Sequence, residues 1–275
     1  MTLDPSPGSI LVIGAGGGIG AATVRCLADR GLSVVASAHR HPLADGVRAH
    51  IVPLDACDDA SVAWAMAAFA SAAGPAPLRG LVYAAGAADL GSVEHTPADV
   101  LARILDVNVV GAARVCRAFL PRLRADGGRI VLVGSLSGRL PQAHMAAYSA
   151  AKAALAAWAD ALRAEVAPLG VRVVLVEPGA VRTGLAASLQ VRPSDRDPAS
   201  PYREAVRARR TALLRDAARG LAPERVAGAI ATALLDDDPP PRVVLDAAPW
   251  RTRLRLLVAA VGGAAAAVRG PGPAR

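Results

Sequence analysis

Tyr148 and Lys152 are the residues of this chain whose types and spacing could support proton transfer. They lie four residues apart in an alanine-rich stretch that predicts a helix, so both side chains project from one face. A lysine ammonium near a phenol favours the phenolate and lowers the tyrosine pKa from its usual value of about 10, so the hydroxyl could exchange a proton with a carbonyl or alcohol oxygen. Ser135, after the apolar run 130–133, could donate a hydrogen bond to the same oxygen.

Composition adds weight to two of the polar residues. Thirty of the 31 basic side chains are arginine, so Lys152 is the only lysine, and Asn108 is the only asparagine. A chain so rich in arginine is expected to keep lysine where a compact, tunable charge is needed. A lone Tyr-x-x-x-Lys often arises by chance, so the prediction depends on accompanying motifs.

A glycine-rich loop near the N-terminus supplies one such motif. The apolar run 10–13 leads into Gly14-x-x-x-Gly18-Ile19-Gly20, and a helical stretch follows over 21–29. A strand, a glycine turn and a helix N-terminus in that order form a phosphate cradle, because bare amides and the positive helix end face the anion. The arrangement predicts dinucleotide binding.

Six further apolar runs predict the remaining strands of a parallel sheet. The 53% apolar composition, mostly Ala, Val and Leu, suits such a sheet with helices on both faces. The predicted strands lie at 10–13, 33–37, 51–54, 81–82, 130–133, 171–176 and 243–245.

The glycine motif with Ser135, Tyr148 and Lys152 resembles the classical short-chain dehydrogenase/reductase family over residues 8 to 247. The resemblance implies one doubly wound (Rossmann) α/β domain, at 1–249, that moves hydride between a nicotinamide cofactor and a carbonyl or secondary alcohol. It implies that Asn108 interrupts the helix predicted from about 96 to 123, and that its backbone carbonyl supports a proton relay through Lys152.

The resemblance also implies a set of cofactor contacts. Besides the glycine turn (Gly14, Gly18, Ile19, Gly20) and the Tyr148–Lys152 pair, the matching positions are Asp55, Ala85, Gly86, Pro178, Gly179, Val181 and Thr183. Two positions depart from the family pattern. Ile13 stands where threonine is usual, and Tyr83-Ala84 where two asparagines are usual, so hydrogen bonds that support the loop and the sheet centre are expected to be lost.

The end of the second strand bears on cofactor choice. An acidic residue there would bind the ribose 2′-hydroxyl and repel a 2′-phosphate, but this chain has Ala38-His39-Arg40. We therefore expect NADP(H) to be preferred, with NAD(H) left open. Arg40, and with less weight His39, could pair with the phosphate, or Arg40 could be a surface arginine.

Two segments fall outside the regular α/β pattern. Residues 184–221 correspond by resemblance to a mobile substrate lid, called the lid segment below, and long connections of this kind are usually functional or disordered. A largely apolar pocket is suggested by Leu140, Met145, Leu185, Leu189 and Tyr202, although several of them could instead simply pack the lid segment down. The basic, apolar tail at 250–275 has its uncharged part at 256–268, too short to span a bilayer, and leaves open peripheral membrane contact or a helix packed on the domain.

Charge and cysteines narrow the remaining classes. The net charge is +8, but arginine is spread along the chain and aromatic residues are few, so no nucleic-acid-binding stripe is indicated. Cys26, Cys57 and Cys116 have neither metal-ligand nor disulfide spacing, which favours a reducing cytoplasm. By resemblance we expect a homodimer or homotetramer. A non-catalytic dinucleotide sensor or scaffold, and dehydratase or epimerase chemistry, stay open as alternatives.

Overall fold

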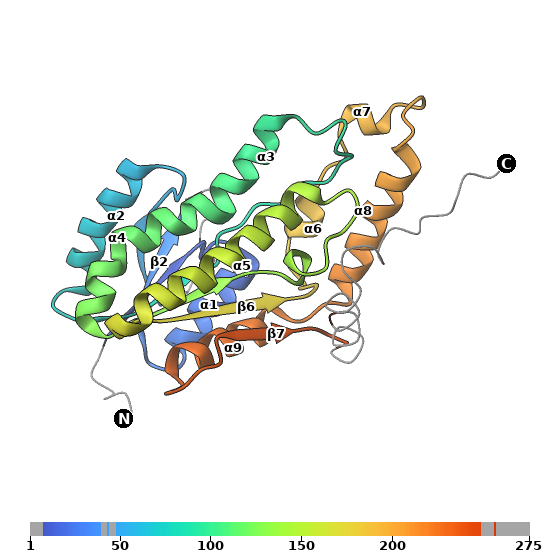
Figure 1. Cartoon of the computed structure of the whole chain (residues 1–275). Coiled ribbons are helices and arrows are strands. Elements are labelled where there is room, and N and C mark those ends of the chain that lie inside the picture. Colours follow the sequence, from blue (N-terminus) through green and yellow to red (C-terminus); the bar gives the residue numbers. More distant parts are fainter. Residues whose placement is uncertain (1–7, 40–42, 44–47, 249–255, 257–275) are drawn as a thin grey trace.

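Seven parallel strands form the central sheet of the protein, in the order β3-β2-β1-β4-β5-β6-β7 (Figure 1). The computed structural model describes residues 8–39, 43, 48–248 and 256. The strands are β1 (Ser9–Ile13), β2 (Ser33–Ala38), β3 (His50–Pro53), β4 (Leu78–Tyr83), β5 (Arg129–Val133), β6 (Arg172–Pro178) and β7 (Arg242–Leu245).

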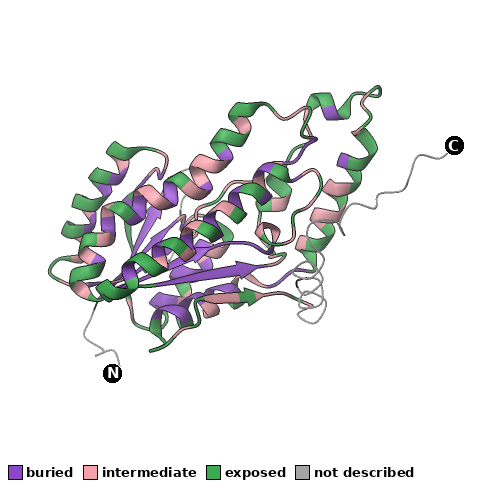
Figure 2. Ribbon diagram, viewed as in Figure 1, coloured by how far each residue is buried: buried purple, intermediate pink, exposed green. Residues whose placement is uncertain are grey.

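Helices cover both faces of this sheet, because successive strand residues point to opposite sides. Leu11 and Ile13 pack in a core with α2, α4 and α5, whereas Ile10 and Val12 pack in a second core with α1 and α9. Figure 2 shows the central strands buried, the edge strand β7 only partly so, and the helices exposed on their outer sides. The larger helices are α1 (Gly18–Ala28), α2 (Asp59–Ala73), α3 (Ala98–Leu105), α4 (Gly111–Asp126), α5 (Ala146–Val166), α8 (Arg203–Ala218) and α9 (Pro223–Leu235).

The seven predicted strands and the doubly wound single-domain fold are confirmed. The fourth strand, predicted at 81–82, begins already at Leu78 and includes Gly80, where a Cβ atom would lie 2.6 Å from the Leu234 side chain. The sequence interpretation placed no helix at Asp59–Ala73, which is α2 in the structure. Its alanines occur on every side, so apolar periodicity is weak there.

The strand order places a crevice between β1 and β4. From β1 the chain continues outward to β2 and β3, then returns to form β4 on the other side of β1. Such a reversal opens a ligand crevice at the carboxyl ends of the strands. The two loops that border it touch: a Cβ atom on Gly14 would lie 2.5 Å from the backbone nitrogen of Ala85.

The lid segment is largely helical. It contains α6 (Leu185–Ser188), α7 (Pro193–Arg196) and α8, which lie beyond the carboxyl ends of the strands (Figure 1). Of the tail predicted at 250–275, only residue 256 is among the described residues. No helix within the described ranges is both long and apolar enough to cross a membrane.

Candidate active site

The glycine turn between β1 and α1 is built for close backbone approach. Gly14 has a φ of +79°, a conformation that suits glycine, and a Cβ atom on Gly20 would lie 2.1 Å from the Gly14 carbonyl oxygen. Among the described residues, no side chain caps the start of α1 at Gly17, so the first backbone amides of the helix are available to an anion. The turn has the geometry predicted for a phosphate cradle.

Ser37 replaces the hydroxyl that Ile13 does not provide. The Gly14 N–H donates to Ser37 Oγ at 3.0 Å, and the Ala15 N–H donates to the Ser37 carbonyl at 3.2 Å. Ser37 lies on β2 and is buried. The glycine turn is therefore held from the neighbouring strand, a compensation that the sequence analysis missed.

Ser135, Tyr148 and Lys152 come together at the carboxyl end of β5. Ser135 follows that strand and is hydrogen-bonded to the Tyr148 hydroxyl. Lys152, only 4% exposed, donates from Nζ to the Val133 carbonyl at 2.9 Å, and the same nitrogen lies 5.8 Å from the centre of the Tyr148 ring. The spacing on α5 thus brings the amine and the phenol into one environment, as predicted.

The pKa of Tyr148 differs from the expected direction. Burial raises it above its usual value, and the hydrogen bond with Ser135 opposes this only in part. The ammonium does not offset the burial because it bonds to the Val133 carbonyl rather than to the phenol. Burial also lowers the pKa of Lys152 to about 8. Burial therefore shifts both groups toward their neutral forms, although at neutral pH Lys152 still keeps its proton.

Asn108 lies in a π-helical turn, η1 (Asp106–Val110), between α3 and α4. The interruption of the helix that the resemblance implied is present. The Asn108 side-chain amide donates to the Ala87 carbonyl at 2.7 Å and to the Ile104 carbonyl at 2.8 Å. Its Oδ1 is buried without a hydrogen-bond partner among the described residues. Single extra-residue π turns inside helices often occur at functional sites.

Gly86 joins this turn to the lysine. A Cβ atom on Gly86 would lie 3.1 Å from Asn108 Oδ1 and 3.6 Å from Lys152 Nζ. The predicted contact residues Ala85 and Gly86 therefore border both the glycine turn and the catalytic candidates. The absence of a side chain at Gly86 leaves room between them.

The segment after β6 lies against the glycine turn. Thr183 approaches Gly18 closely, since a Cβ atom there would lie 2.6 Å from the threonine Cγ2. Val181 forms a parallel bridge with Leu221 at the end of the lid segment. Gly179 donates to the Leu245 carbonyl at 2.7 Å. A cavity of about 480 Å³ lies at this junction; its lining includes Gly18, Arg182–Gly184 and the lid residues Ala186, Ala187, Leu214, Ala217 and Ala218.

The cofactor-selecting end of β2 is only partly described. His39 is exposed, and its Nε2 lies 3.5 Å from a carboxylate oxygen of Asp55. The other Asp55 oxygen accepts from the Cys57 N–H at 2.9 Å, so this side chain also closes the turn after β3. Arg40 lies outside the described residues.

An apolar cluster from the lid and the loops surrounds Tyr148. Leu90, Met145, Leu189 and Val206 are buried together, with Tyr148 packed against them. Tyr202 also packs against this cluster, whereas Leu185 is 40% exposed. Most of the apolar pocket residues suggested by the sequence are thus gathered beside the phenol.

A set of charged and polar side chains fastens the lid to the loop before α3. Asp195 of α7, fully buried, accepts from the Ser92 hydroxyl at 2.7 Å and lies 2.8 Å from His95 Nδ1. Next to it, Arg192 pairs with Asp89 at 2.5 Å. We call these five residues the lid clasp. No pattern in the sequence predicts the lid clasp, because its halves are about 100 residues apart.

Gly91 connects the lid clasp to the start of α5. A Cβ atom on Gly91 would overlap Arg192 Nη1 at 1.7 Å, so only glycine admits the arginine. The Gly91 N–H donates to the carbonyl of His144 at 3.0 Å. His144 has a φ of +63°, the one positive φ among described non-glycine residues. The lid clasp therefore supports the loop that leads directly into the helix of Tyr148.

The residues at the crevice fit a nicotinamide dinucleotide. The glycine turn leaves a cradle that side chains would fill, and the buried, unpartnered Oδ1 of Asn108 marks a polar position beside Lys152. Gly14 to Gly20 would hold the pyrophosphate, and Lys152 with Tyr148 would hold the nicotinamide ribose.

The fold and the residues of this site define a class of protein. Comparison with known proteins assigns the chain to the same class. The sequence model described as short chain dehydrogenase matches residues 9–193. The chain therefore belongs to the short-chain dehydrogenase family. A solved short-chain dehydrogenase from Streptomyces avermitilis is 31% identical, with a TM-score of 0.79 and 94% of each chain covered.

Two curated relatives match over shorter stretches. The 3beta-hydroxysteroid dehydrogenase dhs-16 of Caenorhabditis elegans is 43% identical over 109 residues, which are 39% of this chain and 28% of the relative. The mitochondrial D-beta-hydroxybutyrate dehydrogenase of Bos taurus is 41% identical over 102 residues, 37% of this chain and 30% of the relative. The matched stretches thus span about a third of the length of these relatives.

Proposed function

We propose that this protein is an NADP(H)-dependent oxidoreductase that transfers hydride between the nicotinamide and a ketone or secondary alcohol of a largely apolar small molecule. One observation carries the proposal: Tyr148, Ser135 and Lys152 share a single environment beside the glycine turn and beneath the apolar cluster. The family to which the chain belongs supports it.

In the direction of reduction, Tyr148 gives its phenolic proton to the substrate oxygen. Burial raises the pKa of Tyr148, so the phenol retains this proton at neutral pH until the oxygen gains negative charge. Ser135 Oγ already accepts from the Ser137 N–H at 3.1 Å, which leaves its own hydrogen to polarise the same oxygen. NADPH, when bound, would supply the hydride.

Lys152 binds the nicotinamide ribose and relays protons. Nζ uses one donor on the Val133 carbonyl, and its remaining donors can bond ribose hydroxyls. Because burial lowers the pKa of Lys152 to about 8, the amine can release and regain a proton near neutral pH. Asn108, beside it across Gly86, supports this relay.

The apolar cluster and the relatives support the substrate class. Leu90, Met145, Leu189 and Val206 give the pocket beside Tyr148 an apolar lining. Both relatives described above are named as dehydrogenases of hydroxy compounds, a hydroxysteroid in one and hydroxybutyrate in the other. Turnover of a panel of ketones would identify the substrate within this class.

Preference for NADP(H) rests on the end of β2. Residues 38–40 include no acidic side chain, and His39 lies against the nearby Asp55 carboxylate, reducing the repulsion of a 2′-phosphate.

The only sequence feature that favoured a non-catalytic sensor was Tyr83-Ala84. Because both hydrogens of the Asn108 amide nitrogen are nevertheless bonded to backbone carbonyls, this departure does not weaken the case for an enzyme. We extend the proposal to a cytoplasmic location and to a homodimer or homotetramer; light scattering of the purified protein tests the oligomeric state.

Replacement of Tyr148 by Phe tests the function. Purified wild type and Tyr148→Phe are compared for NADPH and NADH oxidation with ketones of increasing apolar bulk. We expect turnover to fall by about 100-fold or more with unchanged NADPH affinity, because only the proton donor is removed. Equal turnover in both proteins would remove Tyr148 from the mechanism. Tight NADPH binding without turnover of any ketone by the wild type would favour the sensor or another reaction type.

A further inference from the structure

The π-helical turn η1 needs a hydrogen-bond partner from outside the helix. A π turn inserts an extra residue between α3 and α4 and leaves a carbonyl without its regular helical partner. The turn carries Asn108, so any slip back to regular helix would rotate this side chain away from Gly86 and Lys152. The residues that satisfy the turn therefore decide where Asn108 points.

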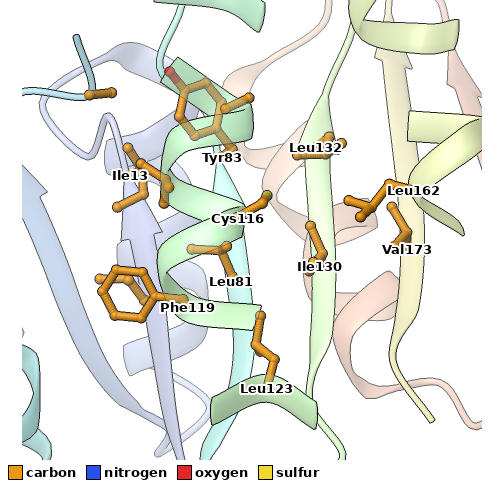
Figure 3. Close-up of a cluster of buried hydrophobic side chains, with 14 of the residues drawn as sticks. Ile13, Leu81, Tyr83, Cys116, Phe119, Leu123, Ile130, Leu132, Leu162 and Val173 are labelled. Atoms are coloured by element: carbon orange, nitrogen blue, oxygen red, sulfur yellow. The ribbon is translucent and has the colours of Figure 1, made fainter. Parts of the chain in front are cut away.

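Tyr83 supplies a hydrogen bond to this turn. It is the last residue of β4 and is fully buried, and its hydroxyl donates to the Val107 carbonyl at 2.6 Å. In Figure 3 the ring lies among the core side chains, with its oxygen at the end beside the green helical ribbon. Burial raises the pKa of Tyr83, so the hydroxyl keeps the proton that it donates.

Gly111, the first residue of α4, has the shape that this hydroxyl requires. A Cβ atom on Gly111 would lie 2.7 Å from the Tyr83 hydroxyl oxygen and 3.1 Å from the Asp106 carbonyl oxygen. The φ of Gly111 is −61°, which any residue can adopt, so space and not backbone conformation demands glycine here. The hydroxyl occupies the room that a side chain would take.

The chain that follows Tyr83 holds Asn108 at a second point. Four residues on, the Ala87 carbonyl accepts one hydrogen of the Asn108 amide, and the Ile104 carbonyl accepts the other. Tyr83 and the chain that follows it thus hydrogen-bond η1 at two points, Val107 and Asn108. With its amide fixed in this way, Asn108 has its Oδ1 on the same side of Gly86 as Lys152 Nζ.

We propose that Tyr83 is a positioning residue for the reaction, acting through Asn108. Its hydroxyl fixes the π turn by bonding Val107 and so sets the placement of Asn108 beside Lys152. The Tyr83-Ala84 positions were expected to lose the hydrogen bonds that two asparagines usually provide in the family. The longer Tyr83 side chain reaches into the helix and supplies support of this kind. The role in catalysis rests on the proposed function, whereas the role in holding η1 does not.

A double-mutant cycle tests the coupling. Tyr83→Phe removes only the hydroxyl and is expected to lower kcat by about 10-fold, since it leaves the Val107 carbonyl unpaired and frees the turn. In an Asn108→Ala background the same change should cost less than about twofold, because the group it positions is gone. NADPH affinity should be unaffected. Wild-type turnover in Tyr83→Phe, or an equal loss in both backgrounds, would overturn the proposal.

Tyr202→Phe is the control for hydrogen exchange alone, because Tyr202 packs against the apolar pocket cluster and its loss would also affect turnover. It also removes one phenolic hydroxyl, whose hydrogen bond to Glu94 measures 2.6 Å, but at the lid and away from η1. Hydrogen exchange of the amides from Asp106 to Gly111 should quicken in Tyr83→Phe and not in Tyr202→Phe. This readout needs no substrate, so it separates failure of the positioning role from failure of the proposed function.

A change on the helix side covers the case in which Tyr83→Phe does not fold. Gly111→Ala keeps the tyrosine but drives a methyl group against its hydroxyl, and we expect the same loss of kcat and faster exchange in η1. Combined with Tyr83→Phe, the two losses should be less than additive, because the hydroxyl at 2.7 Å is absent and only the Ala56 and Asp106 carbonyl contacts at 3.1 Å remain. Unchanged turnover and exchange in Gly111→Ala would contradict the proposal.

Discussion

We call the region around Ser135, Lys152 and Asn108 the catalytic floor. The catalytic floor and the lid segment are held in place by different kinds of interaction. At the floor, Ser135 follows a buried strand, Lys152 bonds the backbone of Val133, and the Asn108 amide bonds two backbone carbonyls. At the lid, Asp195 and Arg192 pair with side chains of a distant loop. Backbone partners come with the fold, whereas side-chain partners depend on individual residues. Changes at the floor should therefore disturb chemistry, and changes at the lid should disturb substrate binding.

Lys152→Met gives the largest expected effect. The variant keeps the length of the side chain and loses its charge and donors, so we expect turnover of the best ketone to fall by about 100- to 10,000-fold. Steady-state kinetics with saturating NADPH measures this. A loss smaller than tenfold would mean that the floor works without its only lysine.

The same variant separates the charge of Lys152 from its structural role. Burial lowers the pKa of Lys152 from 10.5 to about 8. Between these two pH values the unfolded chain therefore binds more protons at this lysine than the folded chain does. The free energy of unfolding rises with pH in this range, because the cost of burying the ammonium is lost. The penalty is complete below about pH 8. We expect the stability of wild type relative to Lys152→Met to rise by about 2 kcal/mol between pH 7.5 and pH 10.

Urea denaturation of both cofactor-free proteins at the two pH values measures this difference. The comparison must be between the two proteins, because burial raises the pKa of Cys57 to about 11 and that of Cys116 to about 12, which lowers the stability of both at high pH. A difference that does not change with pH would mean that the ammonium is well solvated or paired.

The floor was largely predictable, and the reasons are local. Tyr148 and Lys152 are one helical turn apart, and each strand end was readable to within one to three residues from its apolar run. The direction of the Tyr148 pKa was wrong, because a four-residue spacing places two side chains on one face but does not reveal that the amine bonds Val133 instead. Orientation of a donor depends on neighbours outside the motif.

The supports of the site were not predictable from motifs. Ser37 and Tyr83 were missed because each compensates for a departure from the family pattern through a neighbouring element, β2 in one case and β4 in the other. The lid clasp joins Ser92 to Asp195, 103 positions apart, and no periodic pattern in the sequence pairs such residues. A single sequence shows which residue types are present, but not which distant ones meet.

Asp195→Asn tests the lid half of the comparison. An amide cannot accept all of the hydrogen bonds that the buried carboxylate accepts, so the closed lid should be weakened by roughly 1–2 kcal/mol and KM should rise by about 10-fold with little change in kcat. Asp197→Asn is the matched control, because Asp197 is exposed and its side chain, within the described part of the chain, accepts only from the nearby Ala199 N–H.

Trypsin gives a second measure of the same lid. The segment contains Arg192 and Arg196, so a loosened lid should be cleaved faster in Asp195→Asn than in Asp197→Asn. Should KM and cleavage be the same in both variants, the lid clasp would not control closure. A fall in kcat as large as that of Lys152→Met would instead remove the distinction between floor and lid.

His39→Ala gives the smallest expected effect, at the cofactor end of the floor. The imidazole lies 3.5 Å from Asp55 at the surface, where such pairs contribute less than about 1 kcal/mol. Its loss uncovers the carboxylate, so the dissociation constant of NADPH should rise by about threefold while that of NADH stays constant. Fluorescence titration measures both. If the carboxylate is the cause, adding Asp55→Asn should restore NADPH affinity; a loss that persists would mean that His39 contacts the 2′-phosphate directly.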